Sequence, residues 1–406
     1  MSNDTQPEIR FPGFTEDWEE RKLIDLVVRL NKSTNSSRLP KVEFEDIVAG
    51  EGRLNKDVSQ KFDNRKGIEF LPNDILYGKL RPYLKNWLKA TFTGVAIGDF
   101  WVFRAKKSDS DFIYSLIQAD RYQKAANDTS GTKMPRSDWK KVSDTVFYIP
   151  NDLKEQQKIG IFFKKLDDTI ALHQRKLDLL KETKKGFLQK MFPKNGAKVP
   201  EIRFPGFTEA WEERKLGETK TYFTDGNYGE SYPSSKDMSD KENGVPFLRG
   251  SDFSNGYLDS SNANYIKYEK HQELTSGHIK QDDIVIAVRG SLGTLGYANK
   301  ENEGWNINSQ LAILRTNKSE ILGMFLIQYL LSNKGQKEIL SRNTGTALKQ
   351  LPIKQLKDIP IPMPAISEQQ KIGTFFQQLD DTIALHQRKL DLLKETKKGF
   401  LQKMFV

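Results

Sequence analysis

Apolar side chains recur at alternating steps of four and three residues in two long stretches of the chain, residues 155–192 and 368–405. In an α-helix this spacing places them on one narrow stripe, as in a coiled coil. Neither stretch contains an internal proline. The pattern therefore predicts two long helices that pair through their stripes. The stripe positions are Ile159, Phe163, Leu166, Ile170, His173, Leu177 and Leu180, and in the second stretch Ile372, Phe376, Leu379, Ile383, His386, Leu390 and Leu393.

The two stretches are copies of each other, because the chain contains an internal repeat. Residues 7–23 also return as residues 200–216, with a single change from Asp17 to Ala210. Within the helices the copies differ only at outward-facing positions of the heptad. Selection on pairing and a recent duplication would each leave this pattern. The differing pairs are Ile161/Thr374, Lys164/Gln377 and Lys165/Gln378.

The order of segments along the chain favours antiparallel pairing of the helices. A whole globular segment separates them, and parallel pairing would crowd both globular segments at one end. Antiparallel pairing relates the two halves by a pseudo-twofold axis. It also brings His173 and His386 into neighbouring layers, as a polar layer that sets the register or as a pH or metal contact. Lys184 and Lys397 fall on the stripe, and we expect them to reach solvent or fray the helix ends.

A second apolar stripe lies on another face of the predicted helices. It consists of Leu172 and Leu179, with Leu385 and Leu392 in the second copy. Apolar residues are unexpected on a solvated face. They would dock either the chain's own globular domains or a separate partner protein.

The segments between the repeats, residues 24–149 and 217–363, hardly resemble each other. Each alternates short β-like runs with turns, which predicts an α/β (α+β) domain with a mixed or antiparallel sheet and specificity in its loops. We expect two globular domains separated by two long helices that form an intramolecular antiparallel coiled coil. The predicted boundaries are residues 1–150 for the first domain, 151–194 for the first helix, 195–364 for the second domain and 365–406 for the second helix.

Composition narrows the class of protein. The 406 residues are enough for two ordinary cores, and a net charge of +10 favours a polyanionic partner such as nucleic acid. The absence of cysteine excludes disulfides and thiolate zinc sites. No signal peptide and no stretch of ~20 apolar residues is present, so we expect a cytoplasmic protein without membrane contact.

Basic residues gather in the turns of both variable segments. Such turns suit phosphate contacts from lysine and base-edge contacts from arginine, although a solvated basic surface is the alternative interpretation. The closing stretches align on Gly131-Thr132 and Gly345-Thr346. The candidate DNA contacts are Lys79, Arg81, Lys85, Lys133 and Arg136 in the first segment, and Arg249, Arg289, Ser291 and Lys349 in the second.

Catalytic motifs are not visible. The chain has no Gly-x-x-x-x-Gly-Lys phosphate loop and no Asn-Pro-Pro-aromatic motif of adenine methyltransferases, and His271 and His278 have no metal-spaced companions. We therefore expect no catalytic residues and no metal site in this chain. The pattern favours a binding module over an enzyme.

The repeated PEIRFPGF…WE.RKL segment, the Gln-Gln-Lys-Ile passage and the LDDTIALHQRKLDLLKETKKGFLQKMF helix resemble the specificity (S) subunit of Type I restriction–modification enzymes. The resemblance covers the full chain, twice over. It implies two target-recognition domains, each reading half of a bipartite asymmetric site on double-stranded DNA, and two spacer helices that help recruit two methyltransferase subunits. It also implies a non-catalytic chain that binds no cofactor, because S-adenosylmethionine, ATP and Mg²⁺ act through the methyltransferase and the motor–nuclease subunits.

Helix length bounds the expected target. About 38 helical residues at ~1.5 Å each give roughly 57 Å, and domains reaching inward would read patches about one turn, ~34–36 Å, apart. We expect an unread gap of roughly five to eight base pairs. The alternative functions are a coiled-coil scaffold that does not bind DNA and a single-chain nuclease with an unrecognised site.

Overall fold

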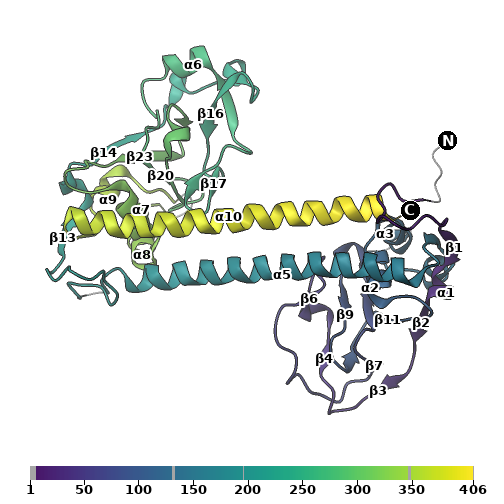
Figure 1. Ribbon diagram of the computed structural model, residues 1–406. Helices are drawn as coiled ribbons and strands as arrows, with labels where there is room; N and C mark the ends of the chain where they lie inside the picture. Colours follow the sequence, from purple (N-terminus) through teal and green to yellow (C-terminus); the bar gives the residue numbers. More distant parts are fainter. Residues whose placement is uncertain (1–5, 130–132, 195, 346–348, 406) are drawn as a thin grey trace. The chain divides into compact units, whose positions relative to one another are not determined.

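The computed structural model describes residues 6–129, 133–194, 196–345 and 349–405. The chain forms two compact units, residues 1–176 with 386–406 and residues 177–385. The long helices α5 (Leu153–Lys190) and α10 (Ile366–Met404) each contribute a part to both units. Each unit therefore combines one globular domain with an adjoining piece of each helix (Figure 1). The predicted boundaries between domains and helices stay a prediction.

The globular part of unit 1 is an α/β domain. Its strands are arranged as an antiparallel sheet β2-β11-β8-β9, a mixed sheet β3-β7-β10-β4, and the pairs β1-β12 and β5-β6. Its elements are β1 (Glu19–Lys22), α1 (Leu23–Leu26), β2 (Val27–Leu30), β3 (Ser33–Thr34), β4 (Lys41–Val42), η1 (Phe44–Asp46), β5 (Ile47–Val48), β6 (Arg53–Leu54), β7 (Gly67–Phe70), β8 (Ile75–Gly78), η2 (Pro82–Leu84), β9 (Trp87–Lys89), β10 (Gly94–Ala96), β11 (Phe100–Ala105), α2 (Ser110–Leu116), α3 (Asp120–Asn127), α4 (Trp139–Asp144) and β12 (Val146–Ile149).

The globular part of unit 2 is also an α/β domain, with the sheets β14-β23-β20-β21-β18-β17, β15-β19-β16-β22 and β13-β24. Its elements are β13 (Glu212–Lys215), η3 (Leu216–Thr219), β14 (Tyr222–Asp225), η4 (Gly229–Ser231), η5 (Ser235–Asp237), β15 (Met238–Ser239), β16 (Gly244–Leu248), β17 (Phe253–Ser254), β18 (Tyr257–Leu258), β19 (Asn264–Lys267), α6 (Tyr268–Glu273), β20 (Ile284–Ala287), β21 (Leu295–Tyr297), η6 (Lys300–Asn302), β22 (Asn306–Ile307), β23 (Leu311–Arg315), α7 (Gly323–Leu331), α8 (Asn333–Ser341), α9 (Ile353–Lys357) and β24 (Pro360–Met363).

The two dissimilar variable segments share a central sheet. The order β2-β11-β8-β9 in unit 1 corresponds to β14-β23-β20-β21 in unit 2, and unit 2 adds β18 and β17. Strands β8 and β20 are buried along their whole length because both faces of the sheet are covered. The prediction of α/β domains with mixed or antiparallel sheets is confirmed.

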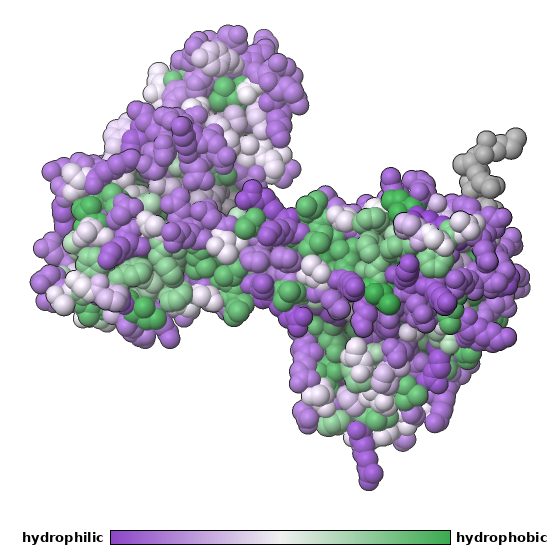
Figure 2. All heavy atoms as spheres, viewed as in Figure 1, coloured by the Kyte–Doolittle hydropathy of each residue, from purple (hydrophilic) through white to green (hydrophobic). Residues whose placement is uncertain are grey.

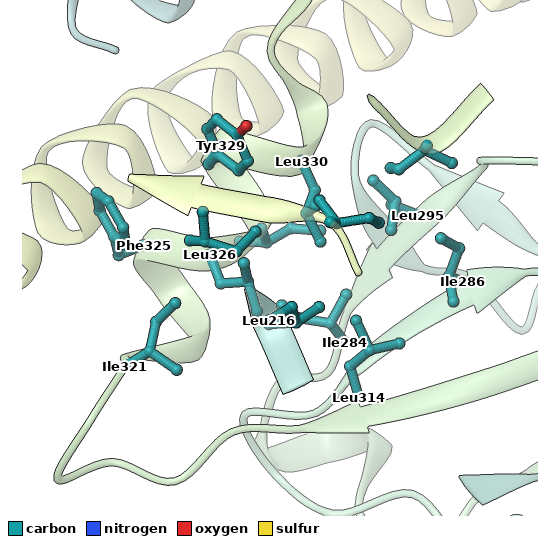
Figure 3. Close-up of a cluster of buried hydrophobic side chains, with 14 of the residues drawn as sticks. Leu216, Ile284, Ile286, Leu295, Leu314, Ile321, Phe325, Leu326, Tyr329 and Leu330 are labelled. Carbon is teal, nitrogen blue, oxygen red and sulfur yellow. The ribbon is translucent and has the colours of Figure 1, made fainter. Parts of the chain in front are cut away.

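Alternating side chains of β20 enter different clusters, as the two-residue period of a strand requires. Ile284 and Ile286 pack with α7, and Val285 and Ala287 belong to the cluster on the other face. Figure 3 shows the first of these clusters, in which Leu326 and Leu330 of α7 lie toward the strand residues, and Phe325 lies farther from them beside the long helix.

Helices α5 and α10 run antiparallel in both units, as predicted. In unit 1, Phe162 of α5 packs edge-on against Phe400 of α10 with ring centroids 4.9 Å apart, and His173 Nδ1 lies 3.1 Å from His386 Nδ1. In unit 2, Phe187 packs edge-on against Phe375 at 5.0 Å. Residue numbers rise along one helix as they fall along the other, which defines the antiparallel sense.

The stripe residues face inward. Ile159, Phe163, Ile170 and Leu177 are buried on α5, as are Ile372, Phe376, Ile383 and Leu390 on α10. Leu166, His173 and Leu180, with Leu379, His386 and Leu393, are half-buried. Near the start of each helix the stripe also joins the core of its domain, because Ile159 and Phe163 pack in unit 1 and Ile372 and Phe376 in unit 2.

The expectation that Lys184 and Lys397 reach solvent or fray the helix ends is wrong. Lys184 Nζ lies 2.6 Å from Asp380 Oδ1 in unit 2, with side-chain exposures of 13% and 7%. Lys397 Nζ lies 2.5 Å from Asp167 Oδ1 in unit 1. Burial raises the pKa of Asp167 and Asp380, and the lysine facing each carboxylate opposes that rise. Each lysine therefore stays between the helices because a carboxylate of the other helix pairs with it.

The histidine layer has a defined geometry in unit 1. At 3.1 Å, one Nδ1 must donate and the other accept, so at least one ring is in the tautomer with a bare Nδ1. Burial, together with His173, Lys176 and Lys389, lowers the pKa of His386. The pair is therefore a polar layer in which a second positive charge is unfavourable.

The repeated segment before each domain fastens the domain to the helices. In unit 1 the guanidinium of Arg10 and the indole N–H of Trp18 both donate to the buried carboxylate of Glu155 at the start of α5. Ile9 N donates to Lys403 O near the end of α10. The near identity of the two copies thus preserves a three-residue clamp and its attachment to a helix end.

The clamp recurs in unit 2. Arg203 and Trp211 donate to Glu368 at the start of α10, and Ile202 N donates to Lys190 O at the end of α5.

Among the described residues, none of the helices combines the length and the apolar character that a membrane span requires.

Removal of Lys184 tests the role of the buried pair. The change Lys184→Ala leaves the carboxylate of Asp380 without its cation, and we expect the free energy of unfolding to fall by about 3–5 kcal/mol. The double change Lys184→Met with Asp380→Leu should recover most of that loss, because apolar residues can fill the same space. Chemical denaturation followed by circular dichroism measures the effect.

Lys185→Ala is the matched control. The Lys185 side chain is 64% exposed and lies 3.8 Å from Glu182 in a surface pair, so its loss should change stability by less than about 0.5 kcal/mol. Equal effects of Lys184→Ala and Lys185→Ala would contradict the structural role of the buried pair.

Candidate nucleic-acid interface

The turn that follows β8 in unit 1 is held against a second segment of the domain. Arg81 N donates to Pro135 O at 2.7 Å, and Ser137 N donates to Lys79 O at 2.8 Å. Lys79 N in turn donates to Asp99 O at 2.9 Å. The main chain therefore brings the predicted contacts Lys79, Arg81 and Arg136 into one cluster.

Charge in this cluster is partly compensated. Asp99 lies 3.5 Å from Lys79 Nζ and 2.9 Å from Arg136 Nη2, yet the side chain of Arg136 remains 59% exposed. Arg81 and Lys133 are exposed as well. The sequence pattern did not indicate Asp99 as part of the candidate interface, because its pairing with Lys79 and Arg136 arises only from the fold. A phosphate or a base would compete with Asp99 for these two cations.

Lys85 faces a different neighbourhood from Arg136. It lines a cavity of about 330 Å³ in unit 1 together with Lys394, Lys397 and Lys398 of α10. Lys394 also pairs with Glu51 at 3.0 Å. Lys85 thus extends the basic surface of the domain toward the helix pair.

The turn that follows β20 in unit 2 occupies the same place in the sheet. Arg289 forms a bridge with Gln350, just as Leu80 bridges Arg136 in unit 1. The Arg289 guanidinium lies 5.2 Å above the ring of Tyr228, and its Nη1 is 3.4 Å from Ser309 O. The side chain of Arg289 is therefore positioned by an aromatic face.

Tyr228 was not identified from the sequence. Its hydroxyl donates to Asp225 Oδ2 at 3.1 Å, and burial and the negative charge of Asp225 raise its pKa. Tyr228 as a whole is 43% exposed. A tyrosine with one open face beside an arginine suits contact with a base or a sugar, but only the fold brings it beside Arg289.

Arg249 lies on a neighbouring loop of unit 2. Its Nε and Nη2 atoms face Asp252 at 3.2 Å, and Nη2 donates to Asn262 O at 2.6 Å. A side chain at Gly250 would come within 3.8 Å of Ser291, so the two loops adjoin. Ser291 and Lys349 are both exposed. The five predicted contacts that lie in the first domain and the four in the second remain predictions, now with known positions.

Some predicted features lie outside the described residues. These are Gly131, Thr132 and Thr346, on which the closing stretches were aligned. The described flanking residues agree with that alignment, because Arg136 and Gln350 hold equivalent bridges in the two domains.

The remaining histidines lie together in unit 2. His271 Nδ1 is 2.5 Å from Asn306 Oδ1, and the rings of His271 and His278 are 4.9 Å apart. Within the described residues, no group of three or more histidine, aspartate or glutamate side chains could hold a metal ion.

The second apolar stripe is open to solvent. Leu172, Leu179, Leu385 and Leu392 are 47%, 68%, 46% and 64% exposed. The globular domain of each unit therefore leaves the leucines of that unit exposed. Figure 2 shows hydrophobic surface along the helices on the face in view.

A basic turn at an equivalent place in each of two domains, with one long helix after each domain in the sequence, defines a two-domain specificity fold. The sequence model of the Type I restriction modification DNA specificity domain matches residues 15–182 and again residues 208–395. The chain therefore belongs to this family and contains two copies of its domain.

Individual relatives agree with that assignment. The putative Type I restriction enzyme MjaX specificity subunit of Methanocaldococcus jannaschii is 30% identical over 61% of this chain and 56% of its own length. The EcoBI specificity subunit of Escherichia coli is 22% identical over 79% of this chain and 75% of its own. The chain thus aligns with little more than half of the MjaX relative.

A solved structure shares the fold. The crystal structure of the S subunit of a Type I restriction–modification system from M. genitalium matches with a TM-score of 0.65 at 15% identity, over 99% of each chain. This likeness extends over both units and both long helices.

Neutralising Asp99 tests the cluster of unit 1. The change Asp99→Asn frees Lys79 and Arg136, so we expect tighter binding to non-target DNA and a salt dependence steeper by about one to two released ions. Fluorescence anisotropy at a series of salt concentrations measures both. Asp144→Asn is the control, because Asp144 pairs with Lys22 of β1 at 3.7 Å and both side chains are about half exposed. An unchanged salt slope in Asp99→Asn would contradict contact between this cluster and phosphates.

Proposed function

We propose that this chain is the DNA-recognition subunit of a Type I restriction–modification complex, and that each domain reads one half of a bipartite, asymmetric target on double-stranded DNA. One observation carries the proposal. The turns after β8 and β20 hold the same place in the two sheets but present different side chains. Equivalent positions with unlike chemistry suit two readers of unlike base sequences.

In this proposal the chain binds DNA without catalysing a reaction on it. Two methyltransferase subunits bring S-adenosylmethionine, and the motor–nuclease subunits use ATP and Mg²⁺. The described histidines support this division, because two of them form the helix layer and the other two contact each other and Asn306. The chain itself needs no cofactor.

The paired helices would set the separation of the two half-sites. Helices of 38 and 39 residues rise by about 1.5 Å per residue. We propose an unread gap of roughly five to eight base pairs, since half-sites about one turn apart are ~34–36 Å from centre to centre.

The exposed leucines would bind the methyltransferase subunits. Each unit has one such leucine on α5 and one on α10, namely Leu172 with Leu392 and Leu179 with Leu385. Two equivalent apolar sites suit two copies of one partner protein.

Exchange of one variable segment tests the two-reader proposal. We expect single-molecule methylation mapping of the host to reveal a split motif with two unlike halves. Replacing residues 24–149 with the same segment of a relative should change one half and leave the other half and the gap intact. A single continuous motif, or a change in both halves, would contradict the proposal.

Substitution of the leucines tests partner binding. The changes Leu172→Glu with Leu392→Glu place two charges on one apolar site, and we expect the complex to lose one methyltransferase subunit. Size-exclusion chromatography with light scattering measures the stoichiometry. Ile161→Glu is the matched control, because Ile161 is 50% exposed on α5 and the second copy has a threonine there. Full assembly of the leucine variant would show that the partner binds elsewhere.

A further inference from the structure

The turn after β8 has a strained backbone. Arg81 and Lys85 both have a left-handed conformation, with φ values of 49° and 56°. Residues other than glycine adopt this conformation rarely, and strained residues of this kind cluster at functional sites. Between them lies η2, which contains Pro82, Tyr83 and Leu84.

Backbone hydrogen bonds fix this strained turn at both ends. Arg81 N donates to Pro135 O at 2.7 Å, and Gly50 N donates to Lys85 O at 2.9 Å. Within the turn, Leu84 N donates to Arg81 O and Lys85 N to Pro82 O. Pro82 is buried, so the turn is anchored through its first helical residue and cannot swing freely.

The anchored turn points apolar side chains outward. Tyr83 is 56% exposed and Leu84 41%, and Met134, beside Pro135, is 51% exposed. Three exposed cations adjoin these residues in the sequence or through the main-chain pairing, namely Arg81, Lys133 and Arg136. Apolar side chains held outward beside cations match a surface that meets the stacked bases of a polyanion.

The corresponding turn of unit 2 is built from different residues. Gly290 holds the position that Arg81 holds in unit 1, and its φ of 69° is a conformation that glycine adopts without strain. The next apolar residue, Leu292, is partly buried against the core of the domain. The exposed apolar side chains nearby, Tyr228 and Leu340, come from other elements, and Tyr228 is fixed by Arg289 and Asp225.

We propose that Tyr83 and Leu84 form an apolar wedge that enters the base stack of one half-site. This half-site is then recognised partly by how easily its DNA deforms. The other half-site is recognised without a wedge. The inference rests on the proposed function and adds a mode of recognition to it. Wedges of this kind unstack a base step, and flexible pyrimidine–purine steps resist them least.

The test uses the full chain assembled with its methyltransferase subunits and DNA that carries the mapped target. 2-Aminopurine replaces one base at a time through both half-sites, because its emission rises when stacking is lost. We expect a wedge-dependent rise at one position of the half-site assigned to residues 24–149. The variant Tyr83→Ala with Leu84→Ala should lose that rise and bind about tenfold more weakly, with an unchanged salt slope.

Phe62→Ala is the matched control, since Phe62 is an exposed aromatic of the same domain at 46% exposure and lies outside the turn. It should keep both the emission and the affinity. The wedge is overturned if every emission signal survives in the double variant, or if that variant binds DNA normally but fails to assemble, which would make the patch a protein contact. Failure of the wild-type complex to prefer any split target would overturn the proposed function, and this inference with it.

Discussion

The pairing of two lysines with two carboxylates across the helix interface constrains how the helices pair. The side chains of Lys184 and Asp380 are 13% and 7% exposed, and those of Lys397 and Asp167 are 12% and 25% exposed. Lys184 and Lys397 are copies of one residue, and so are Asp380 and Asp167. In a parallel, in-register pair of identical helices, each lysine would face its own copy, and like charges in a protein interior are strongly unfavourable. In the antiparallel arrangement each lysine meets an aspartate of the other helix, at 2.6 Å and 2.5 Å. Charge at the helix interface thus selects the sense of pairing that apolar contacts alone would leave weakly determined.

Each domain is then fixed to the helices by the repeated sequence. Glu155 and Glu368 are buried carboxylates that are satisfied by an arginine and a tryptophan from the segment preceding each domain. Removing any member of such a clamp leaves a buried polar group unpaired, which explains why the frame tolerates few differences between its copies. The variable segments need only supply a buried sheet, and their loops are free to differ.

The heptad spacing was sufficient to predict both long helices and their inward stripes, and the order of segments along the chain predicted their antiparallel sense. It could not reveal the partners of Lys184 and Lys397, because Asp380 and Asp167 lie outside the apolar stripe that the pattern detects. The common order of strands in the two domains was also hidden, since only buried apolar character is shared by β8 and β20. Likewise Asp99 and Tyr228 become part of the candidate interface through contacts between distant segments, which no local pattern contains.

The two turns show how one scaffold supports unlike recognition. At the position after the central strand, glycine adopts the left-handed conformation without cost, whereas arginine and lysine adopt it at about 1–3 kcal/mol each. A domain can bear that cost only where its surroundings fix the turn, as Pro135 and Gly50 do in unit 1. The strained turn of unit 1 therefore carries a side chain, that of Arg81, at the position where unit 2 has Gly290. The strained turn gains two outward apolar residues, and the relaxed turn leaves recognition to Arg289 and its neighbours, so the two halves of a target would differ in how they are read as well as in sequence.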